Sequence, residues 1–184
     1  LISVEDVDMK NVIPSLYWGF GNTFTYKNWD LDVFIYSQLG VDKYNDVYSW
    51  TSGRGLGNQT NNMSVYIKDV WHSELNPNGT IPGIAYEMAS VSLPGGAGTD
   101  IGYENSSFVR VRNITLGYNF KPNQLGALSK LLSGIRVYVD VQNPFTFTGY
   151  TGLDPEVNTG GNYKGGKAEY PQTRTFSLGA KLSF

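Results

Sequence analysis

The closing segment of this 184-residue chain, Thr173 to Phe184, alternates strictly between apolar and polar or small side chains from Thr175 onward. The apolar positions are Phe176, Leu178, Ala180, Leu182 and Phe184. Successive side chains of a β-strand point to opposite faces of its sheet, so a period of two predicts a strand with one apolar face and one polar face. Such a strand needs an apolar phase on one side and polar groups or water on the other.

Four earlier segments show a similar alternation. They span residues 16–26, 30–39, 106–118 and 134–145. In the third, Val109 and Val111 have the opposite parity to Ile114 and Leu116. An extra residue near Arg112–Asn113 would put all four on one face, so we expect a β-bulge there.

The composition favours strands over helices. Charged residues make up only 16% of the chain, while Gly (22), Tyr (13), Phe (9) and Trp (4) are plentiful. A net charge of -2 provides no basic face for nucleic acid. The chain has no Cys, which excludes disulfides and thiol catalysis.

The predicted connections alternate between short and long. They cover residues 27–29, about 41–105, about 121–133 and about 147–172. Short periplasmic turns and long extracellular loops are typical of outer-membrane barrels. No apolar run reaches the roughly 18 residues of a membrane helix, but a membrane-spanning strand needs only about 9–11. We therefore expect an all-β fold, an antiparallel transmembrane β-barrel segment in the bacterial outer membrane, with Phe184 on the periplasmic side.

Two of the connections carry helical patterns. Apolar residues recur at helical spacing in the first long connection, which predicts a short amphipathic helix after Asn61 or Asn62; these residues are Met63, Tyr66, Ile67, Val70 and Trp71. Leu125 to Leu132 predicts a helical turn in the third connection.

Residue types that carry covalent chemistry are scarce. His72 is the sole histidine, and beside Trp71 it fits a loop polar residue better than a catalytic base. Asp154 and Glu156 flank Pro155 and fit a turn whose carboxylates accept backbone N–H groups; a Ca²⁺ site needs about six oxygen ligands. We expect no catalytic residues, no metal site, no cofactor and no enzymatic activity.

Several segments together resemble one family. They are Asn143–Val157, Ser106–Tyr118, Tyr170–Gly179, and Trp71 followed by Asn76–Pro77 and Pro82. These segments are similar to the C-terminal signatures of SusC/RagA-type TonB-linked outer-membrane transporters, and the likeness covers most of residues 14–184.

The resemblance implies that residues 1–184 are the C-terminal part of a larger, roughly 22-stranded barrel, of which the chain supplies about five strands. It also implies an N-terminal plug and TonB-interacting region elsewhere in the protein, a SusD-like surface lipoprotein as a lid, and contact with outer-membrane lipids. The expected activity is import of oligosaccharides or peptides.

The aromatic residues divide by position. Those near strand ends suit an interfacial girdle: Trp18, Tyr26, Trp29, Tyr118 and Phe120. Those in or beside the long loops are candidate contacts to substrate or lid, with loop packing as the alternative: Trp50, Trp71, Tyr86, Tyr103, Tyr150 and Tyr163. Phe176, Leu182 and the terminal Phe184 resemble the C-terminal signal for barrel assembly.

Two other functions stay open from the sequence. A passive outer-membrane channel has the same strand pattern. A soluble β-sandwich glycan-binding module also has two-faced strands, but it buries the apolar face that a barrel exposes to lipid.

Overall fold

The computed structural model describes residues 9–45, 48, 64–80, 102–157 and 170–184. The chain divides into two compact units. One consists of Ile13–Val41, Ser106–Gly149 and Pro171–Phe184, and it contains a five-stranded sheet. The other consists of Leu1–Val12, Asp42–Asn105 and Tyr150–Tyr170, and it contains a two-stranded sheet.

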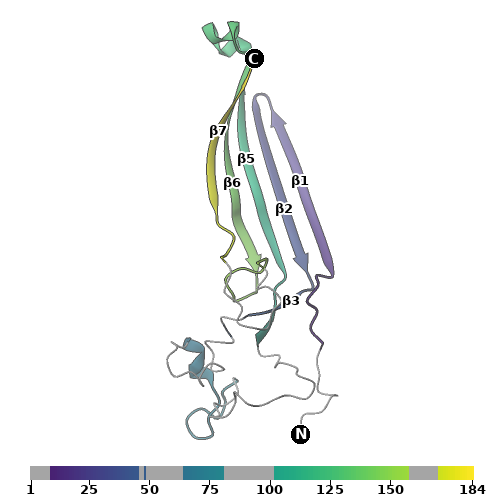
Figure 1. Ribbon diagram of the computed structural model, residues 1–184, viewed down its shortest axis with the longest axis vertical. Coiled ribbons are helices and arrows are strands. Elements are labelled where there is room, and N and C mark those ends of the chain that lie inside the picture. The colour runs from purple at the N-terminus through teal and green to yellow at the C-terminus, as the bar shows by residue number, and fades with distance from the viewer. Residues whose placement is uncertain (1–8, 46–47, 49–63, 81–101, 158–169) are drawn as a thin grey trace. The chain divides into compact units, whose positions relative to one another are not determined.

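The five-stranded sheet has the order β1-β2-β5-β6-β7, and every neighbouring pair is antiparallel. Its strands are β1 (Leu16–Tyr26), β2 (Trp29–Leu39), β5 (Phe108–Phe120), β6 (Gly134–Thr148) and β7 (Thr175–Ser183). They lie side by side in chain order (Figure 1). The all-β antiparallel architecture expected from the alternation is confirmed.

The strand limits agree closely with the sequence pattern. β1 has the predicted bounds, and β2 begins one residue earlier than predicted, at Trp29. Lys27 and Asn28 therefore form the turn, and Lys27 has a φ of 54°. β5 lies two residues further along than predicted, and β6 continues to Thr148 rather than ending near Phe145.

The β-bulge predicted near Arg112–Asn113 is confirmed. The pairing of β5 with β6 shifts between Val111 and Asn113, and the pairing of β2 with β5 shifts at the same level. On β6 the irregularity falls at Asn143 and Pro144; Asn143 has a φ of 49° and Pro144 has no N–H to donate to the ladder. The shift restores one parity to all the valines and leucines of β5.

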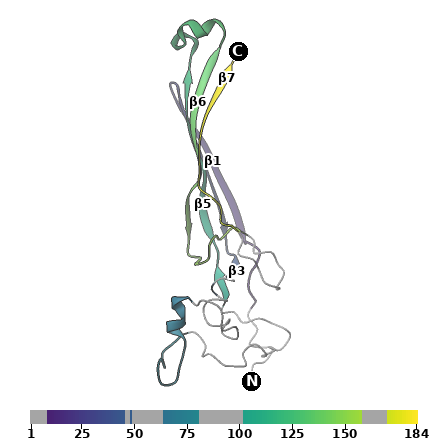
Figure 2. The ribbon, with the colours of Figure 1, turned by 60° about the vertical axis from the view of Figure 1, so that its left-hand side comes forward.

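The five-stranded sheet is a single twisted layer, as two views show (Figure 1 and Figure 2). Large apolar side chains along its strands are therefore exposed, Leu178 by 78% and Phe176 by 70%. Between β5 and β6 run two short 3-10 helices, η6 (Pro122–Gln124) and η7 (Gly126–Lys130), where a helical turn was predicted. None of the helices in the described ranges has the length and apolarity to span a membrane.

The second unit contains a short ribbon and a 3-10 helix. β3 (Asp42–Tyr44) pairs antiparallel with β4 (Tyr103–Asn105), so strand structure extends into both ends of the first long connection. The helix predicted from Met63 to Trp71 is wrong in length: η2 covers only Val65–Asp69, and Met63 lies outside the described residues. The 3-10 helix ends at Val70, which is extended, because Trp71 and His72 enter a separate turn.

Candidate functional site

One face of the five-stranded sheet is apolar from strand to strand. The register places apolar side chains directly opposite one another, because residues that pair across a ladder share a face. One row consists of Phe24, Leu31, Leu116, Val139 and Leu178. The adjacent row consists of Asn22, Val33, Ile114, Val141 and Phe176. Asn22 interrupts this face, as the sequence indicated.

Aromatic rings close this apolar face at the end where β1 turns into β2. Trp29 pairs with Tyr118, and their ring centroids are 4.8 Å apart with edge-to-face geometry. Phe120 packs on Tyr118 at 4.7 Å, also edge to face. The Tyr118 hydroxyl accepts hydrogen bonds from Gln124 Nε2 (3.2 Å) and Asn28 Nδ2 (3.4 Å). A ring on the apolar face thus keeps its polar tip in the polar turn, as interfacial aromatics do.

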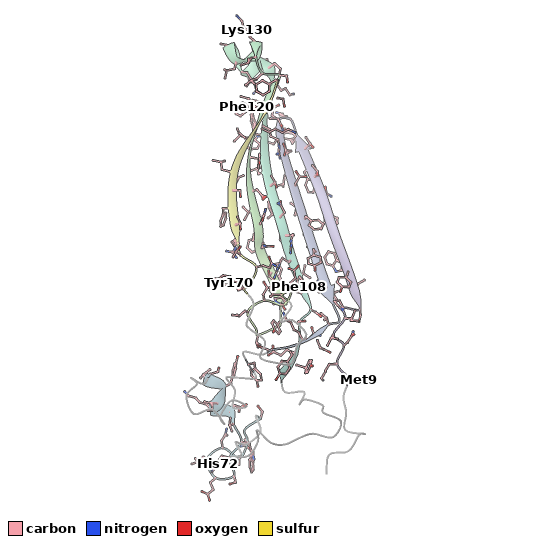
Figure 3. The ribbon with its side chains drawn as sticks, in the orientation of Figure 1. Met9, His72, Phe108, Phe120, Lys130 and Tyr170 are labelled. Atoms are coloured by element: carbon pink, nitrogen blue, oxygen red, sulfur yellow. The ribbon has the colours of Figure 1, made fainter. Side chains whose placement is uncertain are left out.

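The opposite face of the sheet is polar and largely hydrogen-bonded within itself. The residues predicted to face inward share it: Arg136, Asp140 and Gln142 on β6, and Lys181, which pairs with Arg136. β2 and β5 add Asp30, Asp32, Asn113 and Thr115. Figure 3 shows the side chains along the strands, with Phe108 and Phe120 at opposite ends of β5.

An ion pair crosses three strands on this polar face. The Arg136 guanidinium on β6 binds the Asp30 carboxylate on β2, and its Nε lies 3.2 Å from each carboxylate oxygen. Asn119 Nδ2 also donates to Asp30, at 2.5 Å. The pair passes over Gly117 of β5, where a Cβ would meet Arg136 Nε at 2.7 Å. The small residue at Gly117 is therefore what lets the two charges meet across the middle strand.

A second polar cluster follows the bulge. Asn113 Nδ2 donates to both carboxylate oxygens of Asp140, at 2.7 and 3.0 Å, and Asp140 is only 9% exposed. Thr115 in turn donates to Asn113 Oδ1 at 2.9 Å. The bulge at Arg112 is what brings Asn113 level with Gln142 and within reach of Asp140. A buried carboxylate is thereby hydrogen-bonded rather than left unpaired.

The Ser–Phe–x–Arg motif at the start of β5 forms a packed node. Phe108 and Arg110 are 2% and 1% exposed. The Arg110 Nε donates to Thr146 at 2.9 Å, and its guanidinium lies 5.3 Å from the Phe108 ring. Ser107 Oγ accepts from Gly40 N at 2.9 Å, and Ser37 donates to the Phe108 carbonyl at 2.7 Å. The motif therefore fixes the end of β5 to its neighbours.

In the second unit, the Tyr-Thr-Gly-Leu-Asp-Pro-Glu segment (Tyr150–Glu156) is bonded to the β3–β4 ribbon. Glu104 of β4 accepts the Thr151 backbone N–H at 2.9 Å and the Thr151 hydroxyl at 2.8 Å. It also accepts Asn45 Nδ2 at 2.9 Å. Lys43 of β3 donates to the carbonyls of Asp154 (3.0 Å) and Val157.

Asp154 serves this turn as the sequence suggested. Its Oδ1 accepts the Glu156 backbone N–H at 2.8 Å, and Asp154 is 7% exposed. The prediction that a carboxylate caps a backbone N–H in the turn around Pro155 is confirmed.

Residues 64–80 form a compact loop held by His72 and Asn76. The two residues form a β-bridge, and His72 Nδ1 accepts the backbone N–H groups of Glu74 (3.2 Å) and Leu75 (3.1 Å). Asn76 Nδ2 donates to the carbonyls of Lys68 and Val70, each at 3.1 Å. The interpretation of His72 as a loop polar residue beside Trp71 is confirmed, because its ring nitrogen organises the turn.

The candidate contact residues occupy different environments. Trp71 is 48% exposed. Tyr103 packs edge to face on Tyr44, with ring centroids 5.2 Å apart. Tyr150 is buried below the Lys43 ammonium, 5.4 Å from its ring centroid, so its ring packs within the unit. Trp50, Tyr86 and Tyr163 lie outside the described residues.

The three residues of the predicted assembly signal are exposed. Phe176 and Leu182 lie on the apolar face of β7, opposite Val141 and Ile135. Phe184 follows the last residue of β7, and its carbonyl accepts from the Ser133 hydroxyl at 3.3 Å.

Sequence reasoning missed Lys43, Asn45 and Glu104. No alternation of apolar and polar residues marks these positions, because β3 and β4 are each only three residues long. The first long connection separates the two strands in the chain. Asn143–Pro144 was also missed as a strand irregularity, although a Pro within an alternating segment is a recognised sign of one.

No family model matches the chain. Among curated proteins, it is 31% identical over 179 residues to TonB-dependent receptor P3 of Formosa agariphila, which covers 93% of this chain and 16% of the relative. It is 33% identical over 168 residues to TonB-dependent receptor SusC of Bacteroides thetaiotaomicron, covering 90% of this chain and 15% of the relative. The chain thus spans about a sixth of the length of these relatives.

Solved structures of a RagAB peptide importer match the fold. The closed-closed state aligns with a TM-score of 0.74 and 25% identity, over 100% of this chain and 19% of that chain. The open-open state aligns with a TM-score of 0.69 and 27% identity, over 95% and 18% respectively.

Proposed function

This chain belongs to the SusC/RagA family of TonB-dependent receptors, and from that membership we propose that its five-stranded sheet is part of the membrane-spanning barrel of an importer in the bacterial outer membrane. The importer carries oligosaccharides or peptides inward with a SusD-like surface lipoprotein, and TonB drives it through another part of the protein. The chain itself takes part in no covalent chemistry and needs no cofactor.

The observation that carries this proposal is the two-faced single layer. β1 and β2 each have 11 residues. At a rise of about 3.4 Å per residue and a tilt of about 40°, such strands cross roughly 28 Å, which suits the apolar band of about 25 Å in outer-membrane barrels. Lipid covers the apolar rows, and the polar face with Asp30, Arg136 and Asp140 lines the lumen.

The edges of the sheet support a larger barrel. β1 pairs only with β2 and β7 only with β6 among the described strands. Unpaired strand edges are not tolerated in lipid because each unsatisfied backbone group costs several kcal/mol. In our proposal further strands pair with both edges, in a barrel of roughly 22 strands.

The direction of the sheet follows from its connections. The aromatic end with Trp29 and Tyr118 carries the two short connections, so we assign it to the periplasmic rim. The long connections, about 41–105 and 147–172 in the predicted limits, are then extracellular. Phe176, Leu182 and Phe184 lie on or just beyond the last strand, where an assembly signal is expected.

The cargo and lid contacts are proposed for the long connections. The solved relatives are structures of the RagAB peptide importer, which supports peptides as one cargo class. Exposed Trp71 is the described residue best suited to stack on a sugar ring or peptide side chain. Tyr103, Tyr150, Trp50, Tyr86 and Tyr163 remain candidates, with Tyr150 the weakest because it is buried.

The other two functions are less well supported. A β-sandwich module packs a second sheet on its apolar face, yet Leu178 and Phe176 are exposed in this unit. A passive channel shares the strand pattern, but the curated relatives are TonB-dependent receptors.

The test places single cysteines on adjacent residues of β7 that face opposite sides. Leu178→Cys and Ser177→Cys are each labelled with a fluorophore in the whole receptor, reconstituted in vesicles that contain brominated lipid. We expect strong quenching at position 178 and little at 177. Equal quenching at the two positions, or protection of position 178, contradicts the proposed barrel.

A further inference from the structure

The bases of the two long connections are joined by side chains on one face of the β3–β4 ribbon. Asp42–Asn45 and Tyr103–Asn105 flank the first connection, and Tyr150–Val157 begin the second. We propose that the ribbon and residues 150–157 form one cooperative unit, closed by Glu104 and Lys43, through which a disturbance of either long connection changes the order of the other.

The register explains how two side chains make this link. Lys43 lies directly opposite Glu104, so both side chains project from the same face of the ribbon. The neighbouring pair Tyr44 and Tyr103 projects from the other face, where the two rings pack edge to face. The face that carries Lys43 and Glu104 is thus the one that bonds to residues 150–157.

Glu104 uses both carboxylate oxygens for this link. Its Oε1 accepts Asn45 Nδ2 at 2.9 Å and the Thr151 hydroxyl at 2.8 Å, and its Oε2 accepts the Thr151 backbone N–H at 2.9 Å. Asn45, which also donates to Thr151 Oγ1 at 3.2 Å, is only 3% exposed. Hydrogen bonds to a carboxylate are roughly twice as strong as neutral ones, so the bonds of Glu104 link the two connections firmly.

Lys43 holds the far end of the same segment. Its ammonium donates to the carbonyls of Asp154 and Val157 and lies over the ring of Tyr150. Tyr150 and Asp154 are both buried. The lysine therefore contacts the segment at three points, and loss of its charge leaves the carbonyls of Asp154 and Val157 without their ammonium donor.

Cooperativity follows from the size of the ribbon. An isolated two-stranded ribbon is at best marginally stable in water. With three residues in each strand, β3 and β4 depend on additional packing, which residues 150–157 provide. The dependence is mutual, because those residues are bonded to the ribbon through side chains.

Hydrogen exchange of the whole receptor in detergent, without substrate, tests this inference. Thr151→Val changes only the second connection, yet we expect amide exchange in residues 42–45 and 102–105 to become about tenfold faster. Glu104→Ala changes only the first, and we expect a similar effect in residues 150–157. Lys43→Met acts likewise, and Lys43→Arg restores protection because it keeps the charge.

Thr148→Val is the matched control. It also removes a threonine hydroxyl, one that donates to the Ser107 carbonyl at 2.9 Å in the five-stranded unit. We expect exchange in residues 42–45 and 102–105 to stay unchanged in this variant. Heat-modifiable mobility in electrophoresis verifies that each variant barrel is folded.

Effects confined to the connection that carries the substitution overturn the inference. So does an equal effect of Thr148→Val on the ribbon. Because the measurement uses no substrate, either result leaves the proposed transport function untouched.

Discussion

The side chains on the two faces of the five-stranded sheet have opposite surroundings: those on one face bond to one another, and those on the other are exposed. On the polar face, neighbouring strands hold one another through specific bonds, such as Arg136 to Asp30 and Asn113 to Asp140. On the apolar face, Phe24, Val139 and Leu178 extend outward with no covering layer in this unit. Much of the polar face is hydrogen-bonded within the five strands, whereas the apolar face needs a surrounding medium.

This difference indicates which face of such a sheet tolerates substitution and which face requires particular residues. In the proposed barrel, an apolar row tolerates exchange among residues of similar character, because lipid adapts to its surface. The polar face requires matched partners, since an unpaired charge or amide away from water costs several kcal/mol. Gly117 lies beneath the ion pair, and a Cβ at this position would displace the flexible ends of Asp30 and Arg136.

The largest expected effect comes from a charge on the apolar face. Leu178→Arg places a guanidinium in the lipid band, and we expect the free energy of unfolding to fall by about 2 kcal/mol. Ser177→Arg, one residue away on the polar face, is the matched control and should cost much less because it points toward Asp140. Denaturant titration of the receptor in lipid bilayers measures both; equal losses would remove the distinction between the faces.

A smaller loss is expected when the ion pair on the polar face is broken. Arg136→Met leaves the Asp30 carboxylate without its cation, and we expect destabilisation by about 1–1.5 kcal/mol, less than for a fully buried pair because both side chains are partly exposed. The double variant with Asp30→Asn should be less destabilised than the sum of the two single variants. Strict additivity in this double-mutant cycle would show that the two residues do not interact.

The smallest effect is expected at Tyr118, at the aromatic end of the apolar face. Tyr118→Phe keeps the ring contacts with Trp29 and Phe120 but removes the hydroxyl that Gln124 and Asn28 bind. We expect a loss of about 0.5–1 kcal/mol in the same unfolding measurement. Tyr138→Phe, on the polar face of β6, serves as a comparison for loss of a tyrosine hydroxyl elsewhere in the sheet. If Tyr118→Phe leaves the free energy of unfolding unchanged, the ring of Tyr118 acts through its apolar surface alone.

Much of the sheet was predictable because its signal is local. Alternation in residues 16–26 gave the bounds of β1, and the change of parity between Val111 and Ile114 gave the bulge. The placement of Arg136 and Lys181 on the polar face followed from the same parity. These features depend on residues close together in the chain, where a period of two leaves few alternatives.

The second unit was less predictable because its bonds join distant residues. Lys43 reaches Asp154, and Glu104 reaches Thr151, from strands too short to show a period. The helix predicted from Met63 to Trp71 was too long, because His72 and Asn76 draw the following residues into a turn. Tyr150 was grouped with the loop aromatics as a candidate contact, and its burial under Lys43 agrees with the packing alternative.

The sequence by itself determined the strands of the five-stranded sheet, their two faces and the level of the bulge, since each is set by the order of neighbouring side chains. Only the tertiary structure decided which charges meet, that Gly117 makes room for Asp30 and Arg136, and that Glu104 and Lys43 bind residues 150–157. The physical reason is range: alternation acts between adjacent residues, whereas a hydrogen bond or an ion pair depends on where the fold brings two distant side chains.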